Sequence, residues 1–221
     1  MNPGNFVQQL KSISLDCVFN PYSDRCSAFD LKEAPARRSA ALASLLTVAE
    51  HVEVDSLWVG RDLGYRGGRR TGLALTDDIH VSLHAQRWNL QIERATKGQP
   101  QRERTAAVIW KSLSCISVPT FLWNVFPFHP HEPGDPFTNR AHSSREREIG
   151  EQILAELVWL IRPRRIIAIG NNAAASVKRL CTPSELLQVR HPSYGGQNEF
   201  VAQIENIYGL ERPLPVPSLW S

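Results

Sequence analysis

The sequence contains few cysteines and no long apolar run. Its four cysteines, at positions 17, 26, 115 and 181, are widely spread and include no CxxC pair. This spacing argues against a disulfide framework and a compact zinc knuckle, and we expect reduced thiols buried in the core. No apolar run approaches membrane-spanning length, and the first residues lack the charged-then-apolar layout of a signal peptide. We therefore expect a cytoplasmic protein with no membrane partner, associated with the nucleoid if it is bacterial.

Internal repeats and low-complexity segments are also absent. The chain has 221 residues, of which 42% are hydrophobic and 21% charged, as in an ordinary soluble protein. We expect one domain over 1–221 with its core over about 34–208, which leaves the N-terminal segment and the proline-rich tail peripheral. The net charge of +3 permits a polyanionic partner but does not demonstrate one.

Helix and strand patterns alternate along the chain. Short apolar runs predict four buried strands, at 56–60, 120–125, 164–170 and 185–190. Amphipathic or capped segments predict five helices, at 34–52, 104–115, 143–160, 171–180 and 198–207. Strands separated by helices favour parallel pairing. The predicted fold is therefore α/β, a three-layer α/β/α sandwich with a central four-stranded parallel sheet.

Polar side chains follow these strands where each strand ends. Asp62 follows the first strand, Asn124 ends the second, Asn171 and Asn172 follow the third, and His191 follows the fourth. In an open parallel sheet, ligands bind in the crevice beyond the carboxyl ends of the strands. We therefore expect one pocket that combines an acid, an amide and an imidazole.

The loop after the first strand surrounds a single carboxylate with arginine and glycine. It reads GRDLGYRGGRRTGLALT and resembles the first motif of the uracil-DNA glycosylase superfamily, GQDPYHGPGQAHGLAFS, at the same length. FLWNVFPFHP resembles that family's strand ending in a base-reading asparagine, and HPSYGG is similar to its HPS loop. The segment from Asn139 to Val177 resembles the iron–sulfur branch of the superfamily. Together the resemblance covers roughly residues 55–195.

The resemblance implies a monofunctional DNA glycosylase that flips out uracil or a related deaminated base and hydrolyses its bond to deoxyribose, which initiates base excision repair. Asp62 would stabilise positive charge on the sugar and orient the attacking water, and His191 would donate to O2 of the departing base. Asn124 would pair with N3 and O4 of uracil, because one amide offers both a donor and an acceptor. The partner would be DNA, and we expect a monomer.

Further residues would line the base or hold the DNA strand. The resemblance assigns Gly64, Leu75 and Arg61 to the base pocket. It assigns DNA-phosphate contacts to Arg66, Arg69, Arg70 and Ser193. A solvated loop face is the alternative for the three arginines, because most runs of charge are of that kind.

Departures from the family pattern concern the base pocket and the wedge. Gly64 stands where uracil-specific members have a tyrosine that fills the space of a thymine methyl, so we expect open space beside C5 of the base. Leu75 stands where a phenylalanine stacks on the base. Gly195 stands where a leucine enters the emptied duplex, so the wedge is either missing or supplied by Tyr194.

The cysteines also depart from the cluster-binding relatives. Cys17 and Cys26 are too far apart to match their close pair, and neither Cys115 nor Cys181 lies where the other two ligands would. The loop HPHEPGD offers possible metal ligands but has no second ligand cluster. We therefore predict no iron–sulfur cluster, no other metal and no cofactor.

Two other interpretations stay open. A glycosylase of the same fold would act on another base, such as hypoxanthine, xanthine or a 5-substituted uracil, as an open Gly64 position would permit. A catalytically silent DNA-binding relative would explain the lost aromatic and the lost wedge. The joint presence of Asp62, Asn124 and His191 argues against a silent relative, because a mere binder has no need of the acid.

Overall fold

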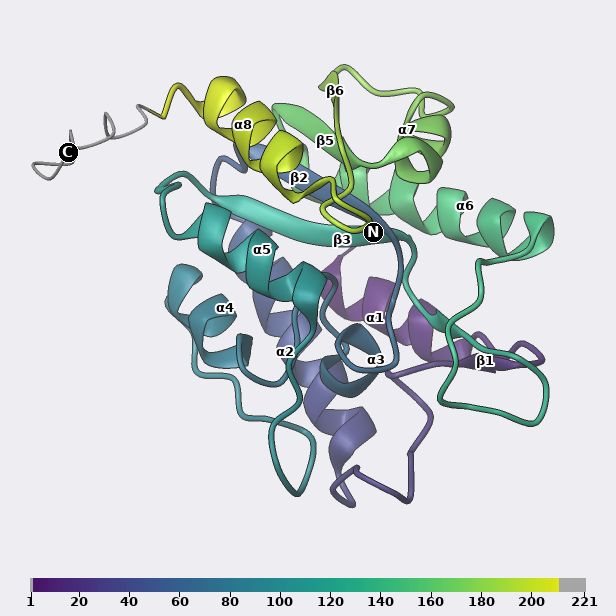
Figure 1. The fold of residues 1–221 in the computed structure, drawn as a ribbon. Helices are drawn as coiled ribbons and strands as arrows, with labels where there is room; N and C mark the ends of the chain where they lie inside the picture. The colour runs from purple at the N-terminus through teal and green to yellow at the C-terminus, as the bar shows by residue number, and fades with distance from the viewer. Residues whose placement is uncertain (1, 211–221) are drawn as a thin grey trace, which may run out of the picture.

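The computed structural model describes residues 2–210 and shows an α/β fold (Figure 1). Its central sheet has four parallel strands in the order β3-β2-β5-β6. Their bounds are Ser56–Asp62 for β2, Thr120–Phe126 for β3, Arg165–Ile169 for β5 and Glu185–Val189 for β6. Helices cover both faces of this sheet. The predicted fold class is confirmed, and each predicted strand begins and ends within two residues of the observed one.

The five predicted helices are all present. They are α2 (Ala34–Glu50), α5 (Arg104–Leu113), α6 (Ser144–Ile161), α7 (Asn171–Val177) and α8 (Gln197–Tyr208). Ser143 caps α6 through a capping box, in which the Ser143 and Glu146 side chains each accept from the other's backbone N–H. The sequence patterns did not predict five short elements, namely α1 (Pro3–Ser12), α3 (Gly68–Thr71), α4 (Val81–Arg87) and the antiparallel pair of β1 (Val18–Phe19) with β4 (His129–Pro130).

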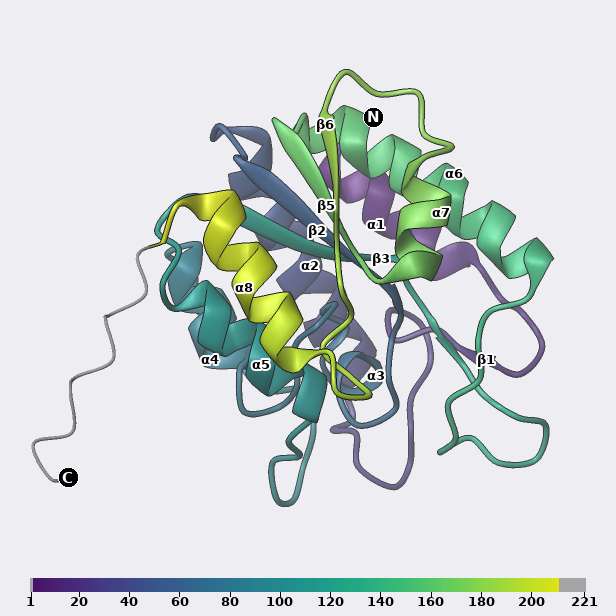
Figure 2. The ribbon, with the colours of Figure 1, turned by 45° about the horizontal axis from the view of Figure 1, so that its top comes forward.

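The sheet separates two hydrophobic cores (Figure 2). On one face, Val59 and Trp123 belong to a core built with α1, α2, α6 and α7. On the other face, Trp58 and Leu122 belong to a core built with α5 and α8. Because side chains alternate along a strand, residues two apart share a face. Strand β2 therefore directs position 60 toward the α5 side, and β3 directs position 124 toward the same side.

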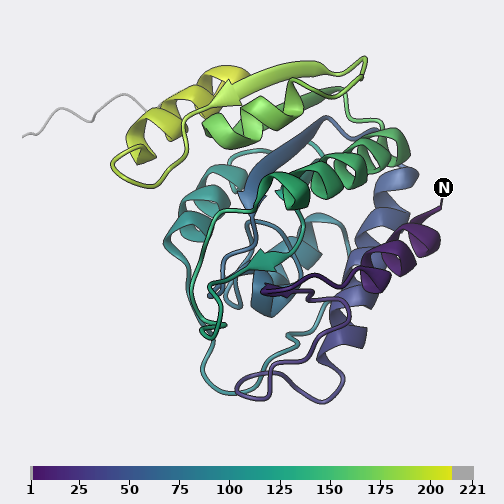
Figure 3. The ribbon, with the colours of Figure 1, turned by 90° about the vertical axis from the view of Figure 1, so that its right-hand side faces the viewer.

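The N-terminal segment is part of the core. Helix α1 lies along α2 (Figure 3), and Phe6, Val7 and Leu10 are buried there. The prediction of a peripheral N-terminal segment is therefore wrong, because ten residues give too short a pattern to reveal a buried helix. The proline-rich tail lies outside the described residues. Across 2–210, no helix combines the length and apolar character needed to cross a membrane.

A buried ion pair attaches α2 to the segment before it, and this segment also bonds to the loop after β2. The Arg38 guanidinium donates to both oxygens of Asp30, at 2.9 Å each, and both side chains are fully buried. Arg38 also donates to the carbonyl oxygens of Pro21 and Asp24, at 2.6 and 2.8 Å. The Tyr22 hydroxyl donates to the carbonyl of Gly72 at 2.8 Å. These bonds connect the segment before α2 with the loop that follows β2.

Replacing Arg38 with methionine should lower the free energy of unfolding by about 3–5 kcal/mol, because Asp30 would be left charged and unpaired in the interior. Arg37→Met is the matched control. Arg37 pairs on the surface with the exposed Glu93, and its loss should cost less than about 1 kcal/mol. Urea denaturation of both variants checks this, and equal losses would contradict the role given to the buried pair.

Candidate active site

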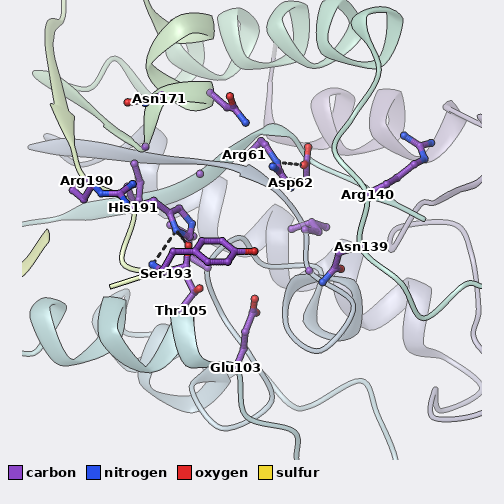
Figure 4. Close-up of a pocket in the computed structure, with 18 residues that line it drawn as sticks. Arg61, Asp62, Glu103, Thr105, Asn139, Arg140, Asn171, Arg190, His191 and Ser193 are labelled. Carbon is purple, nitrogen blue, oxygen red and sulfur yellow. Dashed lines mark hydrogen bonds and ion pairs between the residues drawn. The ribbon is translucent and has the colours of Figure 1, made fainter. Parts of the chain in front are cut away.

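A cavity of about 590 Å³ opens beyond the carboxyl ends of the strands. Its volume is within the range of small-molecule sites. Four residues predicted from the strand ends line it, namely Asp62, Asn171, Asn172 and His191 (Figure 4). Asn124 lies at the same edge, beneath Gly60. The structure thus brings the predicted acid and imidazole to one cavity, with the Asn124 amide directly behind Gly60 in its wall.

Asn124 is buried, and its amide has no partner. Neither Oδ1 nor Nδ2 makes a hydrogen bond within the described residues, where no other side chain leaves two buried polar atoms unpaired. Parallel pairing sets Asn124 opposite Gly60, and a Cβ on Gly60 would lie 2.4 Å from Asn124 Oδ1. Glycine at 60 therefore leaves the amide room toward the cavity. A buried unpaired amide is costly, so we expect a ligand to satisfy it.

The Asp62 carboxylate is held by two side chains. Arg61 Nε donates to Oδ2 at 2.5 Å, and His142 Nδ1 donates to Oδ1. Only 5% of the Asp62 side chain is exposed, whereas Arg61 is 40% exposed and lines the cavity. The carboxylate is therefore fixed in orientation at the cavity wall.

His142 was not predicted as a site residue. It precedes the Ser143 cap of α6, so the capping box fixes its backbone. Arg140 holds the same loop through a bidentate ion pair with Glu146, in which its guanidinium donates to the two carboxylate oxygens at 2.8 and 2.7 Å. The His142 ring also lies against Phe126 of β3, at 6.0 Å between ring centres. His142 does not follow a strand, so the strand-end pattern could not predict it. The sequence showed only a histidine directly before a capping serine.

His191 is arranged as a neutral hydrogen-bond donor. The backbone N–H of Ser193 donates to His191 Nδ1 at 3.1 Å, and the Ser193 hydroxyl lies 2.7 Å from the same atom. Because a backbone N–H can only donate, Nδ1 is the acceptor and Nε2 carries the proton. Burial, with the nearby charges of Arg61 and Arg190, lowers the pKa of His191. The ring is therefore neutral at pH 7 and offers Nε2–H.

Ser193 has a different task from the one predicted. Its hydroxyl and its N–H, which were predicted to bind a phosphate, both turn to His191. Gly64 and Leu75 line the cavity as predicted residues of the base pocket. Arg66 is exposed, with its Nε 2.6 Å from the Tyr65 hydroxyl.

Arg69 and Arg70 are inside the protein, which contradicts the phosphate contacts predicted for them. Arg69 lies 3.9 Å from the centre of the Phe19 ring and donates to the Pro136 carbonyl at 2.7 Å. Arg70 Nε donates to Asp78 Oδ2 at 2.7 Å. Their exposed fractions are 3% and 6%. Both arginines hold the loop together and have no free face for DNA.

The space predicted to be open beside Gly64 is filled by Glu103. A Cβ on Gly64 would lie 2.9 Å from Glu103 Oε1. Glu103 comes from the start of α5 and lines the cavity. Glu103 was not predicted as a site residue, although glutamate is unusual at a helix N-cap and the sequence shows it there.

The cysteines and the possible metal ligands are dispersed. Across 2–210, no group of three His, Cys, Asp or Glu side chains is placed to hold a metal ion. Cys26 is buried as expected, but Cys17 is only partly buried and Cys115 and Cys181 are exposed. The expectation of buried thiols is therefore wrong for these last two, which lie beyond the ends of α5 and α7.

Comparison with known proteins identifies the fold. No protein-family model matches the chain, and no curated protein matches its sequence. A solved structure does match. It is the crystal structure of wild-type SMUG2 from Pedobacter heparinus. The TM-score is 0.61 over 95% of this chain and 98% of that one, at 13% sequence identity. This likeness shows that the two proteins share a fold.

The unpaired amide yields a prediction about stability. Asn124→Leu should raise the free energy of unfolding by about 1 kcal/mol, because it removes a buried group that lacks partners. Asn20→Leu is the matched control. The buried Asn20 side chain donates to Leu10 and Ile13 carbonyls and accepts from the Tyr22 N–H, so its loss should cost about 2 kcal/mol or more. Urea denaturation measures both changes, and a destabilised Asn124→Leu variant would mean that the amide supports the fold.

Proposed function

We propose that the protein is a DNA glycosylase that acts as a monomer and hydrolyses the N-glycosidic bond of uracil, or of a related deaminated base, in DNA. The observation that carries the proposal is that two groups line one cavity while a third lies directly behind Gly60 in its wall. They are the fixed carboxylate of Asp62, the neutral imidazole of His191 and the unpaired amide of Asn124. The motif resemblance and the fold shared with SMUG2 support the same function.

Each group has a part in the reaction. The target nucleotide leaves the base stack and enters the cavity. The Asn124 amide then donates to O4 and accepts from N3–H, which satisfies its two unpaired atoms. Cytosine carries the reversed donor and acceptor pattern and is rejected. The His191 Nε2–H stabilises the negative charge that develops on the base at O2.

Asp62 serves the sugar side of the bond. Its carboxylate stabilises the positive charge that grows on the deoxyribose as the bond lengthens, and it orients the attacking water. Arg61 and His142 hold both carboxylate oxygens, so the charge needs no rearrangement when the sugar arrives. His142 is therefore a positioning residue in this proposal.

The DNA strand is held at the rim of the cavity. The exposed Arg66 stands beside the Gly-rich loop and is our candidate for a phosphate contact. Tyr194 is 97% exposed, has a left-handed backbone with φ of 51° and lines the cavity entrance. We propose that its ring fills the space in the duplex that the flipped nucleotide leaves.

Asp62→Asn should lower kcat for uracil excision by about 10²-fold or more, with DNA affinity nearly unchanged, because the amide cannot stabilise the sugar cation. The assay uses oligonucleotides with a single uracil, hypoxanthine, xanthine or thymine mismatch, and alkali reveals abasic sites. Asp55→Asn is the control, because Asp55 pairs with Arg165 at the opposite end of β2. Turnover that survives in Asp62→Asn would remove Asp62 from the mechanism, and excision of none of the four bases by the wild-type protein would refute the proposed function.

Tyr194→Ala should slow excision from duplex DNA about tenfold more than excision from single strands, since only a duplex has a gap to fill and stacking is worth about 1–3 kcal/mol per base. Trp159→Ala serves as the control, because Trp159 is 60% exposed on α6. The measured quantity is the ratio of duplex to single-strand rates. A ratio that Tyr194→Ala leaves unchanged would contradict the wedge.

A further inference from the structure

Glu103 is an acidic side chain of the cavity that the proposed reaction does not use. It is the N-cap residue of α5, yet its side chain makes no capping bond. Its N–H donates instead to Oδ2 of the buried Asp77, at 2.6 Å. This bond fixes the Glu103 backbone, and the side chain extends from the start of α5 toward the cavity, on the opposite side from Asp62 (Figure 4).

The glycines of the loop after β2 make room for this carboxyl group. A Cβ on Gly67 would lie 1.9 Å from Glu103 Oε2, and a Cβ on Gly64 would lie 2.9 Å from Oε1. Within 2–210 the carboxyl group itself makes no hydrogen bond and no ion pair. The residue is partly buried and lines the cavity, so a molecule in the cavity can contact the carboxyl group. Its natural partner is the molecule that fills the cavity.

The pose of the base gives Glu103 one edge to face. In the proposed pose, Asn124 forms hydrogen bonds with N3–H and O4 of the ring, and His191 donates a hydrogen bond to O2. The edge that remains carries C5 and C6. Gly64 and Glu103 lie side by side in the cavity wall, and we infer that they face this edge.

We propose that Glu103 is a specificity-determining residue, which contacts the C5 side of the flipped base, excludes a 5-methyl group and accepts a 5-substituent that forms hydrogen bonds. This inference rests on the proposed function. A methyl group at C5 would cover the carboxyl group without giving it a partner, whereas a polar substituent would supply one.

The charge of Glu103 adds a second level of selection. Burial, with the negative charge of Asp77, raises the pKa of Glu103 to about 7, and Arg66 acts in the opposite direction. Below pH 7 the group is mostly a neutral acid that donates a hydrogen bond, and above pH 7 it is mostly a carboxylate. The charged or titratable groups facing it are Asp77 behind it, Arg66 on the loop, and Asp62, Arg61, His191 and Arg190 across the cavity.

The size of the pocket is tested with thymine and uracil, each opposite guanine in the same duplex. In Glu103→Ala, the kcat/KM for thymine relative to uracil should rise at least about tenfold, because a pocket rejects an added methyl only through the group it meets. Glu148→Ala is the matched control, because Glu148 is exposed on α6. A wild-type protein that excises thymine as readily as uracil, or an unchanged ratio in Glu103→Ala, would overturn the exclusion.

The charge is tested with uracil that carries a carboxyl group at C5. Its kcat/KM relative to uracil should fall about tenfold between pH 6 and pH 8 in the wild-type protein, as the neutral fraction of Glu103 falls by that factor and the two carboxylates repel each other. Uracil as the reference cancels titrations that both substrates share. In Glu103→Gln the ratio should be flat, because glutamine keeps the size and the hydrogen bonds but does not titrate.

The two proposals fail in different ways. Uracil excision with a flat ratio in the wild-type protein, or with the same slope in Glu103→Gln, overturns the role of Glu103 and leaves the glycosylase standing. A wild-type protein that excises none of these bases overturns both.

Discussion

The parallel pairing of four strands is the constraint on which the site depends. It gathers the carboxyl ends of β2, β3, β5 and β6 at one edge, so groups that are far apart in the sequence share one cavity. The register is equally important, because it sets Gly60 beside Asn124 and directs both toward the α5 side. A shift of one residue would turn both positions to the opposite face.

The glycines near the end of β2 and in the loop after it serve mainly as space. In the sequence, the glycines beside several arginines favour a loop that cradles phosphate. In the structure, the absent side chains at 60 and 67 are replaced by the side chains of Asn124 and Glu103, which come from other elements. The two glycines thus leave space that is occupied by the side chain of Asn124 from β3 and that of Glu103 from the start of α5.

Much of this architecture could be predicted from the sequence, and the rest depended on tertiary contacts. The periodicity of apolar residues was enough to predict the sheet. Their position after a strand end was enough to predict that Asp62 and His191 lie at the same edge of the sheet. Arg69 and Arg70 could not be judged, because an arginine that lies on a phenylalanine ring in the interior looks the same in sequence as one in solvent. His142 and Glu103 come from loops before helices, and only the packed structure reveals that they reach the strand ends.

The polar groups around the cavity differ in their hydrogen bonding, and the difference bears on the proposed function. Asn20, Arg38 and Glu146 are fully hydrogen-bonded, and they fix the segments around the cavity. Asn124 has two buried atoms without a partner, and the Glu103 carboxyl group, which lines the cavity, makes no hydrogen bond within 2–210. A buried polar group without a hydrogen-bond partner lowers the free energy of unfolding of the free protein. When a ligand supplies the partner, that lost free energy contributes to binding. In the proposed function, taking a nucleotide out of a stacked duplex costs a few kcal/mol, and hydrogen bonds from these two groups to the base would offset part of that cost. A base that left either group without a partner would then bind less tightly.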